Sequence, residues 1–221
     1  RAKRHTGACA SAQTLGRTSN SMNLQVFTKL LSKHLYPRLR NEEFRGSGAT
    51  LRRVCGPLVH VFNVQGSSGG QRCYLNLGAQ LAFLSSNSGS SWQPDKVLEY
   101  QCAFRSRIDP PAEQEFGWSY GSSETEAAAN ALAVVEAWET QGLPFFARYG
   151  KFPEDFVRLV DEFSPEQSHP STCLTVARIA SHLGNSRRAA AIAASGLERV
   201  SAQATGLRHS LSQLIASTSA P

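Results

Sequence analysis

The segments VHVFNVQ (residues 59–65) and QRCYLNLG (residues 71–78) decide the fold of this chain. Polar and apolar side chains alternate along much of both segments, and a Gly/Ser-rich stretch at residues 66–70 separates them. A strand sends successive side chains to opposite faces, and glycine-rich linkers between two such runs are typical of hairpin turns. The two segments therefore predict an antiparallel hairpin.

One face of this predicted hairpin is rich in amide side chains, because alternation places on it Asn63, Gln65, Tyr74 and Asn76. Arg105 and Arg107 share a face of a further predicted strand. Amide and guanidinium groups can bind an anion, a carboxylate or the backbone of a partner. The alternative is a polar network that satisfies itself or a face wetted by solvent, since buried polar groups normally find partners.

The remaining pattern predicts an α+β protein with an antiparallel meander sheet of four to five strands, flanking helices and a C-terminal helical hairpin. Outside the hairpin, strands are expected at residues 50–55 and 97–107, with a short fifth element at residues 116–120. Apolar residues at helical spacing follow a cap at Asn20 or Ser21, and a capping box, Ser123 with Glu126, starts a later helix.

The predicted organisation has four parts. A disordered or vector-derived leader (1–21) precedes an α+β domain (22–163), a helical hairpin packed on it (164–200) and a polar tail (201–221). The tail is expected to fray, although some of its apolar residues keep helical spacing.

The leader holds most of the positive charge. Of the net +6, residues 1–21 supply +4 through Arg1, Lys3, Arg4 and Arg17 without any acid, which leaves +2 for the rest. A nucleic-acid partner is therefore not expected, because phosphate binding needs clustered cations in the folded part. Met22 is the single methionine, so we expect the natural protein to start there; an Arg- and Ser-rich transit peptide is the rival interpretation.

The five cysteines are odd in number, widely spaced and without a Cys-x-x-Cys pair. This argues against a disulfide framework and a zinc site, and it favours a reducing, cytoplasmic setting. The histidines lack ligand spacing, so neither a metal nor another cofactor is predicted. No apolar run approaches the roughly 18 residues of a membrane span.

The alternative function is a serine hydrolase. The segment GWSYG (117–121) fits the Gly-x-Ser-x-Gly pattern of a nucleophile elbow, with Ser119 as nucleophile, and it lies between a predicted strand and a helix. Acids and histidines follow in the required chain order: Asp155 or Asp161, then His169, His182 or His209. Against this, the helix of an elbow starts directly after the serine, whereas here the capping box starts it at Ser123.

Several short segments, in this order, carry a resemblance to a known family: LYPRL (35–39), FRG (44–46), FNVQ (62–65), YLNLG (74–78), QCAFRSR (101–107) with Trp118, and LGN (183–185). The chain resembles the bacterial family named domain of unknown function 4304 over most of residues 22–200. It departs from that family at Glu43, where glycine is frequent, and at Leu51, where phenylalanine is frequent.

The resemblance implies an α+β fold with an antiparallel sheet and no particular reaction. Some members of the family lie near polymorphic-toxin genes, which implies an immunity or inhibitor role. We therefore expect a non-catalytic protein-binding module that uses the amide face or the loop at residues 85–95, with its oligomeric state left open. Trp92 and Trp118 are added to the site because tryptophan is enriched in binding hot spots. The expected site residues are therefore Asn63, Gln65, Tyr74, Asn76, Trp92, Arg105, Arg107 and Trp118.

Overall fold

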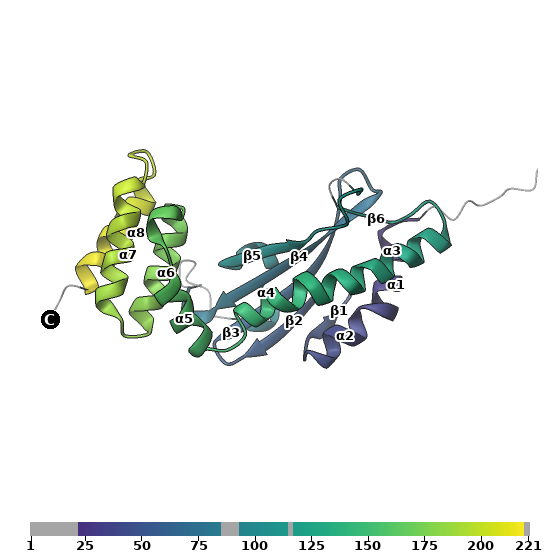
Figure 1. The fold of residues 1–221 in the computed structure, drawn as a ribbon, viewed down its shortest axis with the longest axis horizontal. Helices are drawn as coiled ribbons and strands as arrows, with labels where there is room; N and C mark the ends of the chain where they lie inside the picture. Colours follow the sequence, from purple (N-terminus) through teal and green to yellow (C-terminus); the bar gives the residue numbers. More distant parts are fainter. Residues whose placement is uncertain (1–21, 85–92, 115–116, 219–221) are drawn as a thin grey trace, which may run out of the picture.

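The computed structural model describes residues 22–84, 93–114 and 117–218, and an antiparallel sheet forms its centre (Figure 1). The strands are β1 (Arg45–Ser47), β2 (Thr50–Cys55), β3 (Leu58–Gly66), β4 (Arg72–Leu81), β5 (Phe104–Ile108) and β6 (Trp118–Ser119). Their order is β1-β2-β3-β4-β5, and β6 pairs with β4 beyond the end of β5. The predicted α+β fold with a meander sheet is confirmed.

The hairpin at the centre of the sheet has the register that the alternating pattern implies. Asn63 pairs with Asn76 and Gln65 with Tyr74, so the amide side chains share one face. The opposite face carries apolar pairs such as Phe62 with Leu77.

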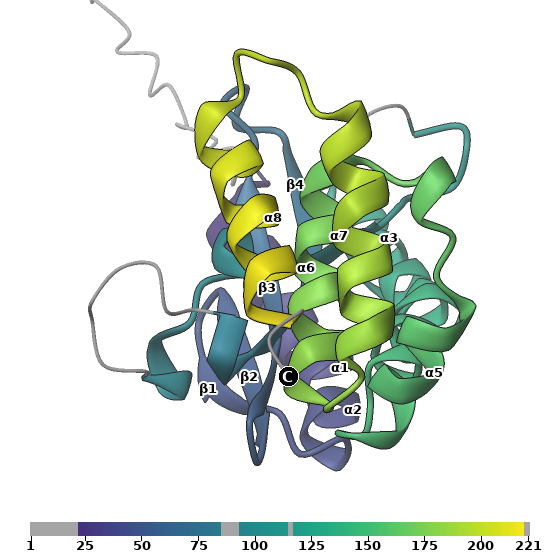
Figure 2. The same cartoon turned by 90° about the vertical axis from the view of Figure 1, so that its left-hand side faces the viewer.

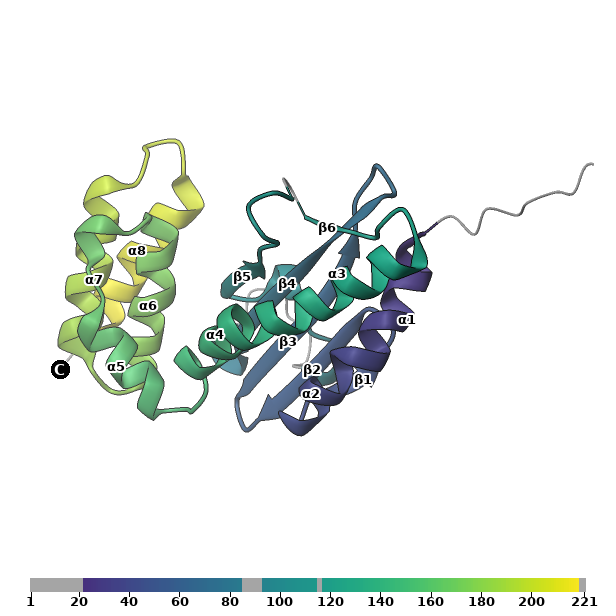
Figure 3. The same ribbon diagram turned by 45° about the vertical axis from the view of Figure 1, so that its right-hand side comes forward.

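A layer of helices covers this apolar face (Figure 3). The layer contains α1 (Leu24–His34), α2 (Tyr36–Asn41), α3 (Glu124–Ala137), a π-helical turn (Trp138–Gly142) and α4 (Leu143–Arg148). Asn23 caps α1 in place of the predicted Asn20 or Ser21. Ser123 caps α3 as predicted, while the Glu126 carboxylate accepts from Ser122 N–H, one residue earlier than in a standard capping box.

A second core lies at the other end of the sheet. Helices α5 (Glu154–Glu162), α6 (Pro170–His182), α7 (Ser186–Arg199) and α8 (Thr205–Thr218) surround it, with α6, α7 and α8 side by side in Figure 2. The sheet contributes Leu58, Ala79, Leu81 and Phe104. The predicted polar tail is wrong for residues 205–218, which form α8 with Leu211 buried. Gly196 lets Cys173 and Leu211 approach α7, because a Cβ on residue 196 would lie 2.8 Å from Cys173 Cβ.

The strand predicted at residues 97–107 is shorter than expected. Only its last part is β5, and residues 93–103 instead form two 3-10 turns, Pro94–Lys96 and Glu99–Gln101, against the amide-bearing side of the sheet. Val97 and Cys102 pack there on Val59 and Val61. This segment, residues 93–103, is called the cover segment below.

No helix within the described ranges combines the length and the apolar character required to cross a bilayer.

The two buried tryptophans of the first core differ in one hydrogen bond. Trp118 Nε1 donates to the Ile108 carbonyl at 2.9 Å, whereas Trp138 Nε1 is buried without a partner within the described residues. Both rings are almost fully buried, so a change to phenylalanine removes similar packing. We expect Trp118→Phe to lower the free energy of unfolding by about 1 kcal/mol more than Trp138→Phe, because it also removes a buried hydrogen bond. Urea denaturation of both variants measures the difference. Equal losses of stability would mean that the hydrogen bond from Trp118 Nε1 to the Ile108 carbonyl does not stabilise the fold.

Candidate binding surface on the open sheet face

The sheet face opposite the helical layer carries the predicted polar side chains. The cover segment packs over one end of this face, at Val59 and Val61. At the other end Gln65 and Arg107 are exposed, and Asn63 and Tyr74 are partly exposed. This region, with the exposed side of the cover segment, is called the open face below.

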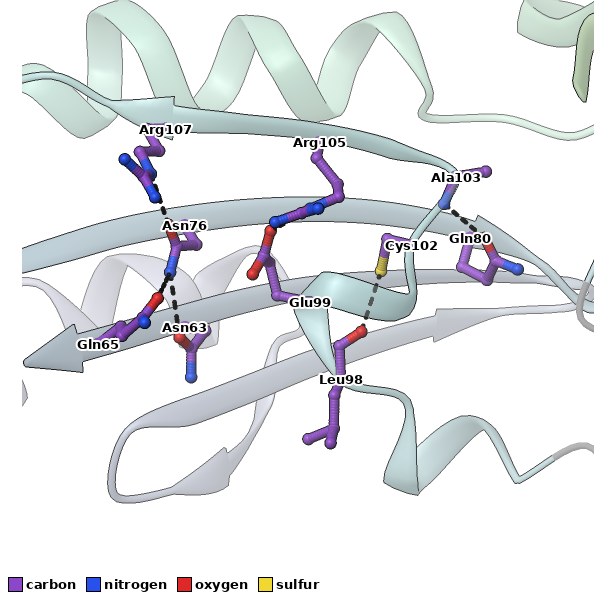
Figure 4. Close-up of polar contacts among 10 residues, drawn as sticks. All are labelled: Asn63, Gln65, Asn76, Gln80, Leu98, Glu99, Cys102, Ala103, Arg105 and Arg107. Atoms are coloured by element: carbon purple, nitrogen blue, oxygen red, sulfur yellow. Dashed lines mark hydrogen bonds and ion pairs between the residues drawn. The ribbon is translucent and has the colours of Figure 1, made fainter. Parts of the chain in front are cut away.

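An amide network joins the strands of the open face (Figure 4). Asn76 is 2% exposed, and its Nδ2 donates to Asn63 Oδ1 at 3.3 Å and to Gln65 Oε1 at 3.0 Å. Asn63 Nδ2 donates in turn to Thr50 Oγ1 at 2.9 Å. Asn76 Oδ1 accepts from Arg107 Nε at 3.1 Å, so hydrogen bonds run from β2 to β5. The network is self-satisfied at its buried centre and ends in an exposed arginine.

Arg107 extends over the ring of Tyr74. Its guanidinium carbon lies 4.6 Å from the ring centroid, a distance at which the cation is attracted by the π-face. Both residues line a pocket of about 300 Å³ between β4, β5 and the loop that follows β5. Arg107, predicted on one strand, therefore contacts both Tyr74 and Asn76, which are predicted on another.

Arg105 does not join this network. Its Nε donates to Glu99 Oε1 at 2.6 Å, and the side chain of Glu99 is 9% exposed while that of Arg105 is 50% exposed. Figure 4 shows Arg105 and Arg107 on the same strand, reaching different partners. The ion pair anchors the cover segment, and the Gln80 carboxamide adds to this by accepting from Ala103 N–H at 2.7 Å.

The exposed part of the cover segment is not among the predicted site residues. Tyr100 is 65% exposed and Leu98 is 36% exposed, next to the Glu99 that binds Arg105. Both lie within the strand predicted at residues 97–107. The sequence does contain a signal for this segment. Val59 and Val61 are apolar side chains on the amide-bearing face, so another part of the chain has to cover them.

The two tryptophans predicted at the surface have different outcomes. Trp92 lies outside the described residues. Trp118 is fully buried in the first core, so its prediction as a surface contact residue is wrong. Its ring fills the space between β4 and the helices because Trp118 pairs with Cys73, whose side chain faces that core.

Ser119 lies on the short strand β6. Its Oγ accepts from Gly121 N–H at 3.1 Å, and α3 begins only at Glu124. His169 caps α6 and contacts Ser171, while His182 is exposed and stacks on Phe83 at the edge of the second core, with ring centroids 3.7 Å apart. The described contacts do not join either histidine to Ser119.

Two buried thiols and the metal-binding residue types are the other candidates for a reactive centre in the described residues. Burial raises the pKa of the Cys73 and Cys102 thiols to about 12, which keeps both protonated and weakly nucleophilic near neutral pH. Within the described ranges no three His, Cys, Asp or Glu side chains are grouped so that they could hold a metal ion. The open face thus presents amide, guanidinium and phenol groups, which are hydrogen-bonding and charged groups suited to binding.

Comparison with known proteins places the chain in a family without assigning it a reaction. Neither a curated protein nor a solved structure matches it. Residues 35–148 match the family described as Domain of unknown function (DUF4304), and the matched region holds the whole amide network and Arg105. Because this match spans more than half of the 221 residues, the chain belongs to the DUF4304 family.

Proposed function

We propose that this chain is a non-catalytic, cytoplasmic protein-binding module of the bacterial immunity or inhibitor type, and that the open face contacts the partner. The observation that carries the proposal is the exposed pair Tyr100 and Leu98, next to the ion pair that holds Arg105. Aromatic residues and arginine are enriched in protein interfaces, and tyrosine and arginine are frequent hot spots.

The charges of this face favour an acidic protein partner over a nucleic acid. Arg105 and Arg107 are exposed. Arg52 Nε instead donates to the Val97 carbonyl at 2.6 Å, and Arg45 donates to the Phe44 carbonyl at 3.1 Å, so these two cations are committed within the chain. Arg105 is already paired with the Glu99 carboxylate, which leaves Arg107 as the one of the two without a carboxylate partner among the described residues. One such cation suits a carboxylate of a partner better than an extended run of phosphates.

The cytoplasmic part of the proposal rests on the cysteines. Cys55, Cys73, Cys102 and Cys173 are free thiols, three of them buried. Free cysteines of this kind are typical of reducing compartments.

Tyr100→Ala tests the proposed surface. Immobilised wild-type protein is exposed to extract of the native cells, the retained protein is identified by mass spectrometry, and its affinity for each variant is then measured by titration. We expect Tyr100→Ala to weaken binding about tenfold or more, the effect of losing one hot spot. Leu132→Ala removes a 50% exposed apolar side chain from α3, on the opposite side of the sheet, and serves as the matched control with unchanged binding.

Two results would contradict the proposal. One is equal binding by Tyr100→Ala and wild type. The other is labelling of wild-type protein, but not of Ser119→Ala, by a fluorophosphonate probe, which would support the serine hydrolase instead.

A further inference from the structure

We propose that the pocket beside Arg107 binds a carboxylate group of the partner, with Arg107 as the residue that contacts it. This inference rests on the proposed function and names the chemical group that the open face recognises. The pocket has a volume of about 300 Å³, and the residues that matter here are Tyr74, Arg107, Asp109, Pro110 and Pro111.

Arg107 is fixed from two sides. Its Nε donates to Asn76 Oδ1 at 3.1 Å, and its guanidinium lies over the Tyr74 ring at 4.6 Å. Its two terminal amino groups make no hydrogen bond within the described residues. They form the planar fork that a carboxylate accepts through two parallel bonds. A side chain already held in one orientation loses less conformational entropy on binding than a freely rotating arginine.

The amide network determines the orientation of Asn76, which is a positioning residue. Asn76 Nδ2 donates to both Asn63 and Gln65, which leaves Oδ1 directed at Arg107. A flipped amide would place Nδ2–H groups against the guanidinium, donor against donor. This accounts for a nearly buried asparagine in the middle of β4, between Leu75 and Leu77: it holds an exposed cation in place.

No carboxylate of the described residues forms an ion pair with Arg107, in contrast to Arg105. The partner of Arg107 is a neutral amide, whereas Arg105 is paired with the Glu99 carboxylate at 2.6 Å. The two arginines lie two residues apart on the same face of β5, so they form a natural internal comparison. Of the two, Arg107 is the one that combines a fixed orientation with a charge that no described carboxylate pairs, and it lies beside a pocket.

The lining of the pocket favours a singly charged carboxylate over a phosphate. Asp109 lies on the same pocket, and its negative charge opposes a doubly charged anion more strongly than a carboxylate. Tyr74, Pro110 and Pro111 give apolar walls that suit a short hydrocarbon stem. A glutamate side chain or the C-terminal end of a peptide chain has this chemistry.

The test uses small carboxylates and no protein partner. Nuclear magnetic resonance follows the arginine Nε–H signals during titration with N-acetylglutamate α-amide, which has a side-chain carboxylate, and with N-acetylglycine, which has a chain-terminal one. N-acetylglutamine amide is the neutral control. We expect a saturable shift of the Arg107 signal with at least one acid, none with the neutral amide, and little change at Arg105. The stronger of the two acids identifies the source of the carboxylate.

Three variants complete the test. Arg107→Lys keeps the charge but removes the planar fork, and we expect it to weaken acid binding about tenfold, measured on neighbouring backbone signals. Asp109→Asn should strengthen binding by removing a repulsive charge. Arg187→Lys, at an exposed position on α7, is the matched control and should bind like wild type.

The inference is overturned if Arg105 and Arg107 shift equally, if sodium chloride produces the same shift, or if Arg107→Lys binds the acids like wild type. Failure of the proposed function gives a different result. Binding of the acids without any retained protein partner would contradict the protein-binding role alone, whereas a partner held equally by wild type and Arg107→Lys would contradict the carboxylate site alone.

Discussion

Replacing Gly78 with alanine is expected to lower the free energy of unfolding by about 2–3 kcal/mol. A Cβ at this position would lie 2.6 Å from Cys102 Sγ and 2.9 Å from Cys102 Cβ, where the cover segment crosses the sheet. Gly78 pairs with Val61 on one side and with Arg105 on the other, so β4 cannot retreat without breaking both ladders. The clash should instead displace the cover segment and, with it, Glu99 and Tyr100.

Urea denaturation monitored by tryptophan fluorescence measures this effect. Gly69→Ala is the matched control, because a Cβ there would meet nothing within 4 Å and the change should alter stability by less than about 0.5 kcal/mol. The double variant Gly78→Ala/Cys102→Gly removes the clashing atoms and should recover part of the loss. A Gly78→Ala protein as stable as wild type would show that the cover segment does not press on the sheet in solution.

The hairpin was predictable because its signal is local. Alternation within residues 59–65 and 71–78 determines which side chains share a face, and pairing of Asn63 with Asn76 follows from the register. The need for glycine at position 78 was not predictable, because the atom that excludes a side chain belongs to Cys102, 24 positions later in the chain.

The sequence predicts which residues lie on the candidate site, but it does not predict which of them bind one another. Alternation placed Asn76 and Arg107 on strand faces, and the structure pairs these two residues across β4 and β5. The same pattern gave Arg105 an equal role, although Glu99 binds it. The difference arises because the cover segment folds into 3-10 turns, which alternation cannot distinguish from a longer strand.

Two other discrepancies have local causes. Glu43, at a position where the family often has glycine, has a φ of 64°, so the turn keeps the left-handed backbone that glycine adopts more easily. Helix α8 was expected to fray because of its Ser, Ala and Thr content. Packing of Leu211 into the second core outweighs this weak intrinsic preference.

Acidification from pH 6.5 to pH 4 is expected to remove about 3 kcal/mol of stability through His60 alone. His60 is fully buried on β3, on the helical side of the sheet. Its Nε2 donates to the Tyr149 carbonyl at 2.7 Å, and its Nδ1 accepts from Arg53 Nε at 3.0 Å. Both ring nitrogens are thus committed in the neutral form, and a second proton would oppose the Arg53 N–H.

Burial lowers the pKa of His60 from 6.5 to about 4, and the Arg53 charge lowers it further in the same direction, against the weaker opposing effect of the Tyr149 carbonyl. Above pH 6.5 the imidazole is neutral in the folded and the unfolded chain, so the full stability is present. Between pH 6.5 and 4 the unfolded chain binds a proton that the folded chain does not, and stability falls as the pH falls. Below pH 4 both forms are protonated, and His60 contributes no further change.

Urea denaturation at pH 7, 6, 5 and 4 tests this for wild type and His60→Gln, a variant that keeps a polar side chain of similar length but does not titrate. Carboxyl groups titrate at low pH in both proteins, so the difference between the two curves isolates His60. We expect the stability of wild type to fall about 3 kcal/mol further than that of His60→Gln over this interval. Parallel curves would mean that His60 accepts a proton in the folded chain, and that its bonds to Arg53 and to the Tyr149 carbonyl do not hold it neutral.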